Sequence, residues 1–148
     1  MSAAGRGRAR HSSTLAVMAK HVIRPENLTF LPQRAYPYSP GARGGGLVYT
    51  SGQVAWDADQ QIVGIGDPAA QTRQVLSNIT SILLEGGATL ADVLKCNVYL
   101  SDIRYFQAMN DVFAEFFPVD PPARTTVEAR LATPAMLVEI EATAWVGD

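Results

Sequence analysis

The chain has 148 residues, of which 47% are hydrophobic, and a formal net charge of −2. That size and apolar content suit one domain with a sizeable core, and the weakly acidic balance gives no overall attraction to nucleic acid or to an anionic membrane. With one cysteine, Cys96, the chain can form neither an internal disulfide nor a cysteine-based zinc cluster. We therefore expect a cytoplasmic single-domain protein whose partners are small molecules or other protein chains.

The N-terminal segment differs in composition from the rest of the chain. Residues 1–17 contain three arginines and no acidic residue, since the first acidic residue of the chain is Glu26, so that their removal takes the net charge from −2 to −5. Three interpretations stay open: a disordered basic tail, an organellar transit peptide, and a start codon placed too early, with Met18 as the true start. We expect residues 1–20 to lie outside the fold and residues 21–148 to form one domain. No apolar run reaches the roughly 18 to 20 residues of a membrane span.

Residues 41–56, GARGGGLVYTSGQVAW, combine glycines with strand-forming residues. The glycines indicate a turn that leads into two short strands, with a break near Ser51 and Gly52. A phosphate-binding loop would need a Gly-Lys-Ser/Thr ending or a GxGxxG motif that opens a helix, and neither is present. The segment is therefore predicted to belong to a sheet.

A long helix is predicted over residues 68–85. Asp67 is a good N-cap and Pro68 suits the first helical position, while Gly86 and Gly87 form a typical helix end. Between these signals, apolar residues recur at steps of three and four and define one face: Val75, Leu76, Ile79, Ile82 and Leu83. We expect the helix to pack through this face.

The stretch VLKCNVYL, residues 93–100, alternates with a period of two, as a strand does. The apolar side of this predicted strand carries Leu94, Cys96, Val98 and Leu100, and the other side carries Lys95, Asn97 and Tyr99. Cys96 is interpreted as a packing residue, because a nucleophilic thiol needs a helix terminus or a cationic neighbour.

A second helix is predicted to start at the cap Asp102 and to end before Pro118. Its predicted buried stripe consists of Ile103, Phe106, Phe113 and Phe117. Asn110 lies on this stripe, and a buried amide needs hydrogen-bond partners. The sequence leaves open whether nearby backbone groups or a functional site supply them.

Two final strands are predicted over residues 123–131 and 137–146. Their alternation groups Arg124 with Thr126, Glu128 and Arg130, and Glu139 with Glu141, Thr143 and Trp145. The sheet is therefore expected to have one apolar face for the helices and one polar face, whose arginines and aromatic residues favour an oligomer interface. Arg124 follows a stiff Pro-Pro loop, and its planar guanidinium can either bind a carboxylate ligand or pair with Glu139 or Glu141.

Five short motifs occur in order along the chain: YTSGQ (49–53), QTRQVLSNI (71–79), FQAMNDVFAEFF (106–117), PPAR (121–124) and VEIEA (138–142). Together they resemble the RidA/YjgF family, and the resemblance extends from about Leu28 to Val146. The specific part of the pattern is PPAR with VEIE after it and TSGQ upstream, because the first glutamate of VEIE follows the arginine by fifteen residues.

The resemblance implies an α+β fold of the chorismate-mutase type, in which a mixed six-stranded sheet packs two helices on one face. It also implies a homotrimer with a central β-barrel and with active sites between subunits. Members with arginine at this position hydrolyse enamines and imines of the 2-aminoacrylate type to 2-keto acids and ammonia, without a metal or organic cofactor. The expected partners are a small carboxylate substrate and further copies of the chain, and neither nucleic acid nor a membrane.

The resemblance also implies roles for individual residues. Carried over by position, Arg124 would bind the substrate carboxylate and Glu139 would position the attacking water. The backbone of Thr126 would hold the imine nitrogen, while Ser51 and Asn110 would shape the pocket.

Two further points concern the pocket. Tyr38 would close it from a neighbouring subunit. Thr126 departs from the family, in which cysteine is common at this position. The change is mild if the residue acts through its backbone, but it shifts the substrate range if the cysteine thiol sets the polarity of the pocket.

Two other functions stay open. A non-catalytic trimer could hold small carboxylates in the same Arg124 pocket, and it would not need Glu139. Some relatives are credited with ribonuclease or translation-inhibitor activity, but an acidic chain without an aromatic and basic stripe argues against RNA binding.

Overall fold

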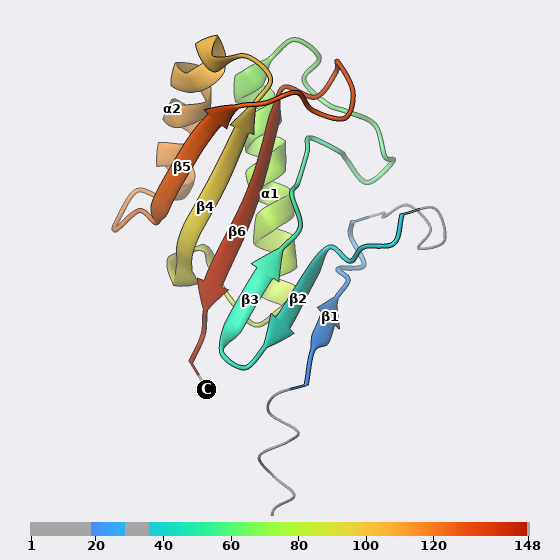
Figure 1. Ribbon diagram of the computed structural model, residues 1–148, viewed down its shortest axis with the longest axis vertical. Helices are drawn as coiled ribbons and strands as arrows, with labels where there is room; N and C mark the ends of the chain where they lie inside the picture. The colour runs from blue at the N-terminus through green and yellow to red at the C-terminus, as the bar shows by residue number, and fades with distance from the viewer. Residues whose placement is uncertain (1–18, 29–35, 148) are drawn as a thin grey trace, which may run out of the picture.

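The computed structural model describes residues 19–28 and 36–147. In this part of the chain, one six-stranded sheet carries two helices on one face (Figure 1). The helices are α1 (Pro68–Glu85) and α2 (Phe106–Phe116), and the strands are β1 (His21–Ile23), β2 (Gly41–Gly44), β3 (Leu47–Thr50), β4 (Val93–Leu100), β5 (Ala123–Glu128) and β6 (Val138–Trp145). The sheet order is β1-β2-β3-β6-β4-β5, with β4 and β5 parallel and all other neighbours antiparallel. The predicted mixed sheet with two helices on one face is confirmed.

Almost all of the predicted N-terminal tail lies outside the described residues, as do residues 29–35 and residue 148. Within the described ranges, neither helix combines the length and the apolar character that a membrane span requires.

Helix α1 begins and ends at the predicted residues. The side chain of Asp67 accepts a hydrogen bond from Ala70 N at 3.0 Å, and the helix ends at Gly86. All five residues of its predicted apolar face are fully buried against the sheet and α2. Full burial of one such side chain stabilises the fold by about 1.5–3 kcal/mol, so this face holds the helix on the sheet.

The glycine-rich segment forms a hairpin of β2 and β3. Gly45 has a φ of +56°, which glycine adopts without steric strain in a tight turn. Strand β3 ends at Thr50, near the predicted break, and the chain rejoins the sheet at Gln53. There Gln53 N donates to Ile140 O at 2.8 Å, and Ile140 N donates to Gln53 O at 3.1 Å. This exchange brings the segment after Ser51 to β6.

Strand β4 shows the predicted alternation except at its start. Cys96, Val98 and Leu100 are fully buried, but Leu94 is 55% exposed, so its predicted place on the apolar face is wrong. The cause is a register shift against β6 between Val93 and Lys95, which inserts an extra residue and inverts the alternation at that point.

Helix α2 also differs from the expected stripe. Phe113 and Phe117 are buried, but Ile103 and Phe106 are 48% and 37% exposed. Asp102 caps this region as predicted, because its side chain accepts a hydrogen bond from Arg104 N. The first turn is a 3₁₀ helix, Ile103–Tyr105, whose side-chain positions do not continue the α-helical stripe.

Strand β5 contradicts the expectation of one shared polar face. It is the edge strand and runs parallel to β4, with Cys96 opposite Arg124 and Val98 opposite Thr126. Because paired residues point to the same side of a sheet, Arg124 and Thr126 lie on the helix-bearing face. Glu139 is paired with Tyr99 and lies on the other, open face. The two polar groups of the last strands are therefore on opposite sides of the sheet.

Candidate functional site

The predicted site residues fall into two groups, and the first lies around Arg124 beside α2. A cavity of about 390 Å³ opens there, and it is lined by Asn110, Phe113, Ala114, Phe117, Pro121, Pro122 and Arg124. The Pro-Pro loop places Arg124 at the start of β5, and α2 supplies the opposite wall. Half of the predicted site is thus built from the end of one helix and the start of one strand.

The guanidinium of Arg124 is held by an amide and by aromatic rings. Its Nη2 donates to Asn110 Oδ1 at 2.8 Å, and its Cζ lies 4.7 Å from the ring centre of Phe113 and 5.5 Å from that of Phe106. Ring faces attract a cation without using its hydrogen-bond donors. Asn110 is therefore bonded to a functional candidate and not to nearby backbone.

No acidic side chain in the described part of the chain forms an ion pair with Arg124. The alternative of a salt bridge to Glu139 or Glu141 does not occur within one chain, since both glutamates lie on the open face of the sheet. A guanidinium has five N–H donors, so most of those on Arg124 stay free for a ligand.

Thr126 lies on the same face of the sheet as Arg124, two residues further along β5. Its Oγ1 is buried and has no hydrogen-bond partner among the described residues. Buried hydroxyl groups are normally paired. Thr126 therefore brings one unused donor and acceptor to the neighbourhood of the arginine.

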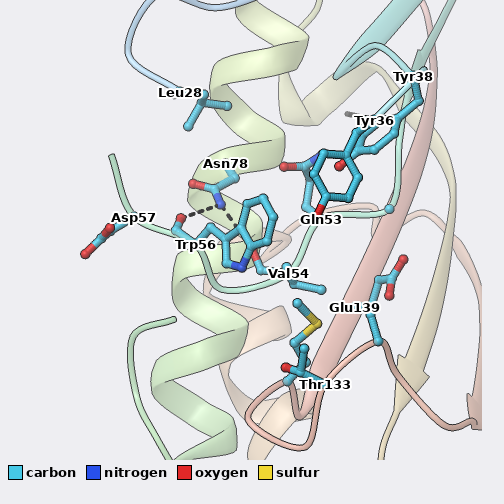
Figure 2. A pocket seen from close by; sticks show the side chains of 13 residues that line it. Leu28, Tyr36, Tyr38, Gln53, Val54, Trp56, Asp57, Asn78, Thr133 and Glu139 are labelled. Carbon is cyan, nitrogen blue, oxygen red and sulfur yellow. Dashed lines mark hydrogen bonds between the residues drawn. The ribbon is translucent and has the colours of Figure 1, made fainter. Parts of the chain in front are cut away.

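The second group of predicted residues lies around Glu139 at the start of β6. A cavity of about 440 Å³ is lined by Glu139, Tyr38, Gly52 and Gln53, among others, and Figure 2 shows Glu139, Tyr38 and Gln53 around it. Gly52 leaves the space that the carboxylate occupies, because a Cβ at this position would lie 3.0 Å from Glu139 Cδ and even closer to Oε1. The position of the Glu139 carboxylate therefore needs glycine at residue 52.

Burial raises the pKa of Glu139, and the charge of Glu141 raises it further. Glu141 is itself fixed on the open face, where its Oε1 accepts hydrogen bonds from Tyr99 Oη at 2.7 Å and from Asn97 Nδ2 at 3.1 Å. A carboxylate whose pKa is moved toward neutrality is better suited to exchange a proton with water.

Tyr38 and Ser51 belong to the Glu139 group within one chain. Both Tyr38 and Glu139 line the same cavity, and the pKa of Tyr38 is raised by burial and then by the charge of Glu139. Ser51 Oγ donates to Ser39 O at 2.5 Å and Ser51 N donates to Pro40 O at 2.8 Å. Ser51 thus ties the segment that carries Tyr38 to the end of β3.

One chain therefore holds the candidate residues in two separate groups. Arg124, Asn110 and Thr126 lie by α2, and Glu139, Tyr38 and Ser51 lie at the start of β6. Neither of the two cavities contains residues of both groups. Among the described residues, no three His, Cys, Asp or Glu side chains lie close enough together to ligate a metal ion.

Several residues of the Glu139 cavity were not predicted as site residues. Its walls include Leu28, Val54, Trp56, Asn78 and Met136. They come from four separate segments of the chain, and no spacing in the sequence links them. The nearest signal was the tryptophan that follows the TSGQ motif.

Comparisons with known proteins agree with this architecture. The family model described as Endoribonuclease L-PSP matches residues 31–146. The Rid-family protein YyfA from Yersinia pestis, a protein of unknown function, shares 36% sequence identity with a TM-score of 0.79, and the match covers 86% of this chain and 100% of that one. A YjgF/YER057c/UK114-family protein from Mycobacterium tuberculosis shares 34% identity with a TM-score of 0.75 and the same coverages. RidA from an Antarctic Psychrobacter shares 30% identity with a TM-score of 0.76, and the match covers 85% of this chain and 99% of that one. The chain therefore belongs to the Endoribonuclease L-PSP family, the Rid/YjgF family of these structural neighbours.

Proposed function

We propose that this protein hydrolyses enamines and imines derived from 2-amino acids to 2-keto acids and ammonia, at sites that two copies of the chain build together. The observation that carries the proposal is the guanidinium of Arg124, which is oriented by Asn110 and two aromatic rings and has no acidic partner among the described residues. A positioned guanidinium with free donors matches a carboxylate ligand.

Arg124 binds the carboxylate of the substrate through two parallel hydrogen bonds. Each charge-assisted bond is worth about 1.5–3 kcal/mol, so this contact can hold a small substrate in one orientation. Thr126, one alternation further along β5, offers its backbone and its unpaired hydroxyl to the imine nitrogen. The arginine group therefore binds the substrate without reacting with it.

Glu139 supplies the chemical step. An enamine first tautomerises to the imine, whose carbon is electrophilic. Glu139 accepts a proton from water as the water oxygen bonds to the carbon of the N-protonated imine, which gives a neutral carbinolamine. The carboxyl group of Glu139 returns this proton to the amino nitrogen, and the hydroxyl proton passes to the carboxylate and on to solvent as the C–N bond breaks and ammonia leaves. A general base and a fixed orientation suffice for such a carbon. The raised pKa of Glu139 makes the return of the proton to nitrogen easier.

The separation of the two groups supports an assembly in which Arg124 of one copy faces Glu139 of the next. The open face of the sheet carries Lys95, Asn97, Tyr99, Glu141 and Trp145, which are polar or aromatic and suit an interface. Three copies joined through this face, with their sheets around a central barrel, complete three sites.

A semicarbazide competition assay tests the proposal. An amino-acid oxidase generates imines, and semicarbazone formation is followed with no protein, with wild type, and with Arg124→Ala, Glu139→Gln and the control Arg73→Ala. Arg73 is an exposed arginine that bridges α1 to Glu115 of α2. We expect wild type and Arg73→Ala to suppress the semicarbazone signal catalytically and the two site variants not to do so.

The same variants separate the alternatives. If wild type binds 2-keto acids through Arg124 but suppresses no semicarbazone signal, the protein is a carboxylate-binding assembly and the deaminase proposal is wrong. If Arg124→Ala hydrolyses imines as fast as wild type, the guanidinium has no part in the reaction.

A further inference from the structure

The cavity that contains Glu139 extends well beyond the space needed for a carboxylate and an imine. Its volume is about 440 Å³, within the range of roughly 300–1,000 Å³ that is typical of small-molecule pockets. In Figure 2 Glu139 lies at one end of the cavity, and the indole of Trp56 faces it from the other side, near Val54. Met136, Leu28 and Tyr36 also line the cavity.

The side-chain amide of Asn78, which lines this extension, is already satisfied by the fold. Asn78 is buried, and its Nδ2 donates to Trp56 O at 2.9 Å and to Val54 O at 3.2 Å, while its Oδ1 accepts from Gln74 Nε2 at 2.9 Å. The amide of Asn78 therefore fixes the backbone of the segment that carries the tryptophan. It does not offer free donors to a ligand.

Asp57 is, besides Glu139, the charged residue among those that line the cavity. Its Oδ1 accepts hydrogen bonds from Asp59 N at 2.9 Å and from Gln61 N at 3.0 Å, and its carboxylate points away from the cavity (Figure 2). Gln53 is buried and uses its Nε2 on Ser51 O. The space between Glu139 and Trp56 is thus bounded mainly by apolar atoms.

We infer that this extension binds the side chain of the substrate, and that the preferred substrates are imines and enamines with large, uncharged, apolar side chains, such as those derived from leucine, methionine or phenylalanine. The inference rests on the proposed function for the orientation of the substrate. A three-carbon imino acid has only a methyl group to place against these walls, whereas a branched or aromatic side chain removes the surfaces of Trp56, Val54 and Met136 from water. An acidic side chain would meet Glu139 in a half-buried space.

Competing imines test the inference directly. An oxidase that accepts alanine, leucine and phenylalanine supplies the three imines, and kcat/KM is measured for each by semicarbazide competition. We expect the leucine- and phenylalanine-derived imines to exceed the alanine-derived one by about 10-fold or more. Trp56→Ala should lower that ratio by about 10-fold, and the control Leu84→Ala, at an exposed position of α1, should leave it unchanged.

A binding measurement gives a second, independent readout. The chain has two tryptophans, so Trp145→Phe leaves Trp56 as the sole indole. Its fluorescence is titrated with 4-methyl-2-oxopentanoate and with pyruvate, which are products and need no turnover. We expect the larger keto acid to perturb Trp56 with a Kd lower by about 10-fold. This titration tests the binding of the substrate side chain beside Trp56 even if the variant Trp56→Ala does not fold.

The outcomes separate this inference from the proposed function. If all three imines are hydrolysed at similar rates and Trp56→Ala leaves the ratio unchanged, the side-chain pocket is refuted while the deaminase stands. If no imine is hydrolysed but the larger keto acid binds beside Trp56 more tightly, the deaminase fails and the apolar pocket stands. If neither hydrolysis nor a preference in binding is seen, both are overturned.

Discussion

Gly52→Ala is expected to disable the site without unfolding the protein. A methyl group at this position would lie 3.0 Å from Glu139 Cδ and 3.2 Å from Cγ, and it would overlap Oε1. Carbon atoms in contact are normally about 3.5–4.0 Å apart, so the carboxylate has to retreat by up to about 1 Å. A displacement of that size in a catalytic group costs about 100-fold in rate, which corresponds to about 2.7 kcal/mol of transition-state stabilisation.

The expected loss of stability is much smaller than the loss of activity. Glu139 ends in a flexible carboxylate that can turn away, and an off-rotamer side chain costs about 0.5–1.5 kcal/mol. The matched control is Gly44→Ala, because a Cβ there meets no atom within 4 Å. Imine hydrolysis is measured by semicarbazide competition, and thermal unfolding is followed in parallel for both variants.

Two results would refute this reasoning. Wild-type kcat/KM in Gly52→Ala would mean that the position of the Glu139 carboxylate does not govern the reaction. An equal loss of activity in Gly44→Ala would mean that the effect comes from the strands in general and not from this contact.

Three further predictions concern other parts of the molecule. Gln71→Leu should lower the free energy of unfolding by about 1–3 kcal/mol, because it leaves Leu137 N and two backbone carbonyls without their buried hydrogen-bond partner. Urea unfolding measures this free energy, and a change near zero would contradict the prediction. The thiol of Cys96, whose pKa burial raises to about 12, should react with a disulfide reagent only after the protein unfolds, so rapid reaction of the native protein would be contrary evidence. As the pH is lowered, kcat/KM should fall when Glu139 becomes protonated, at a pH above the ordinary glutamate pKa of 4.5. Glu141→Gln should move this fall in kcat/KM to lower pH, because it removes the negative charge that raises the pKa of Glu139. A pH profile of kcat/KM that is the same in Glu141→Gln and wild type would exclude an effect of Glu141 on Glu139.

Local signals in the sequence predicted local structure well. Helix α1 was predicted to the residue because Asp67, Pro68 and Gly86 act on their own neighbours, and its apolar face follows from the period of the helix. Leu94 was misplaced because a bulge is a property of two paired strands, and the sequence of one strand does not contain it. Ile103 was misplaced because the first turn is 3₁₀. Phe106 is the first residue of α2, and its ring contacts the guanidinium of Arg124 while it stays partly exposed.

The arrangement of the site depended on information that alternation does not carry. The alternation of side chains along a strand groups Arg124 with Thr126 and Glu139 with Glu141, but it does not show which group faces the helices. The parallel pairing of β5 with β4 decides this, because it sets Arg124 opposite the buried Cys96. The roles of the six candidate residues came from the resemblance, although the residues alone already singled out Arg124 and Asn110. The apolar wall around Trp56 did not, because distant segments form it only after folding.

The central claim is that Arg124 and Glu139 act together from different copies of the chain, and mixed assemblies test it most directly. Arg124→Ala and Glu139→Gln are each inactive alone under this account. When the two variants are co-expressed with different tags and purified through both, some sites combine an intact Arg124 from one copy with an intact Glu139 from the next. In a cyclic trimer that contains both variants, one of the three interfaces joins an intact Arg124 to an intact Glu139, so about one third of the sites are restored. Recovery of imine hydrolysis to a comparable fraction of wild type is the predicted result, and mixed assemblies that stay inactive would contradict the claim.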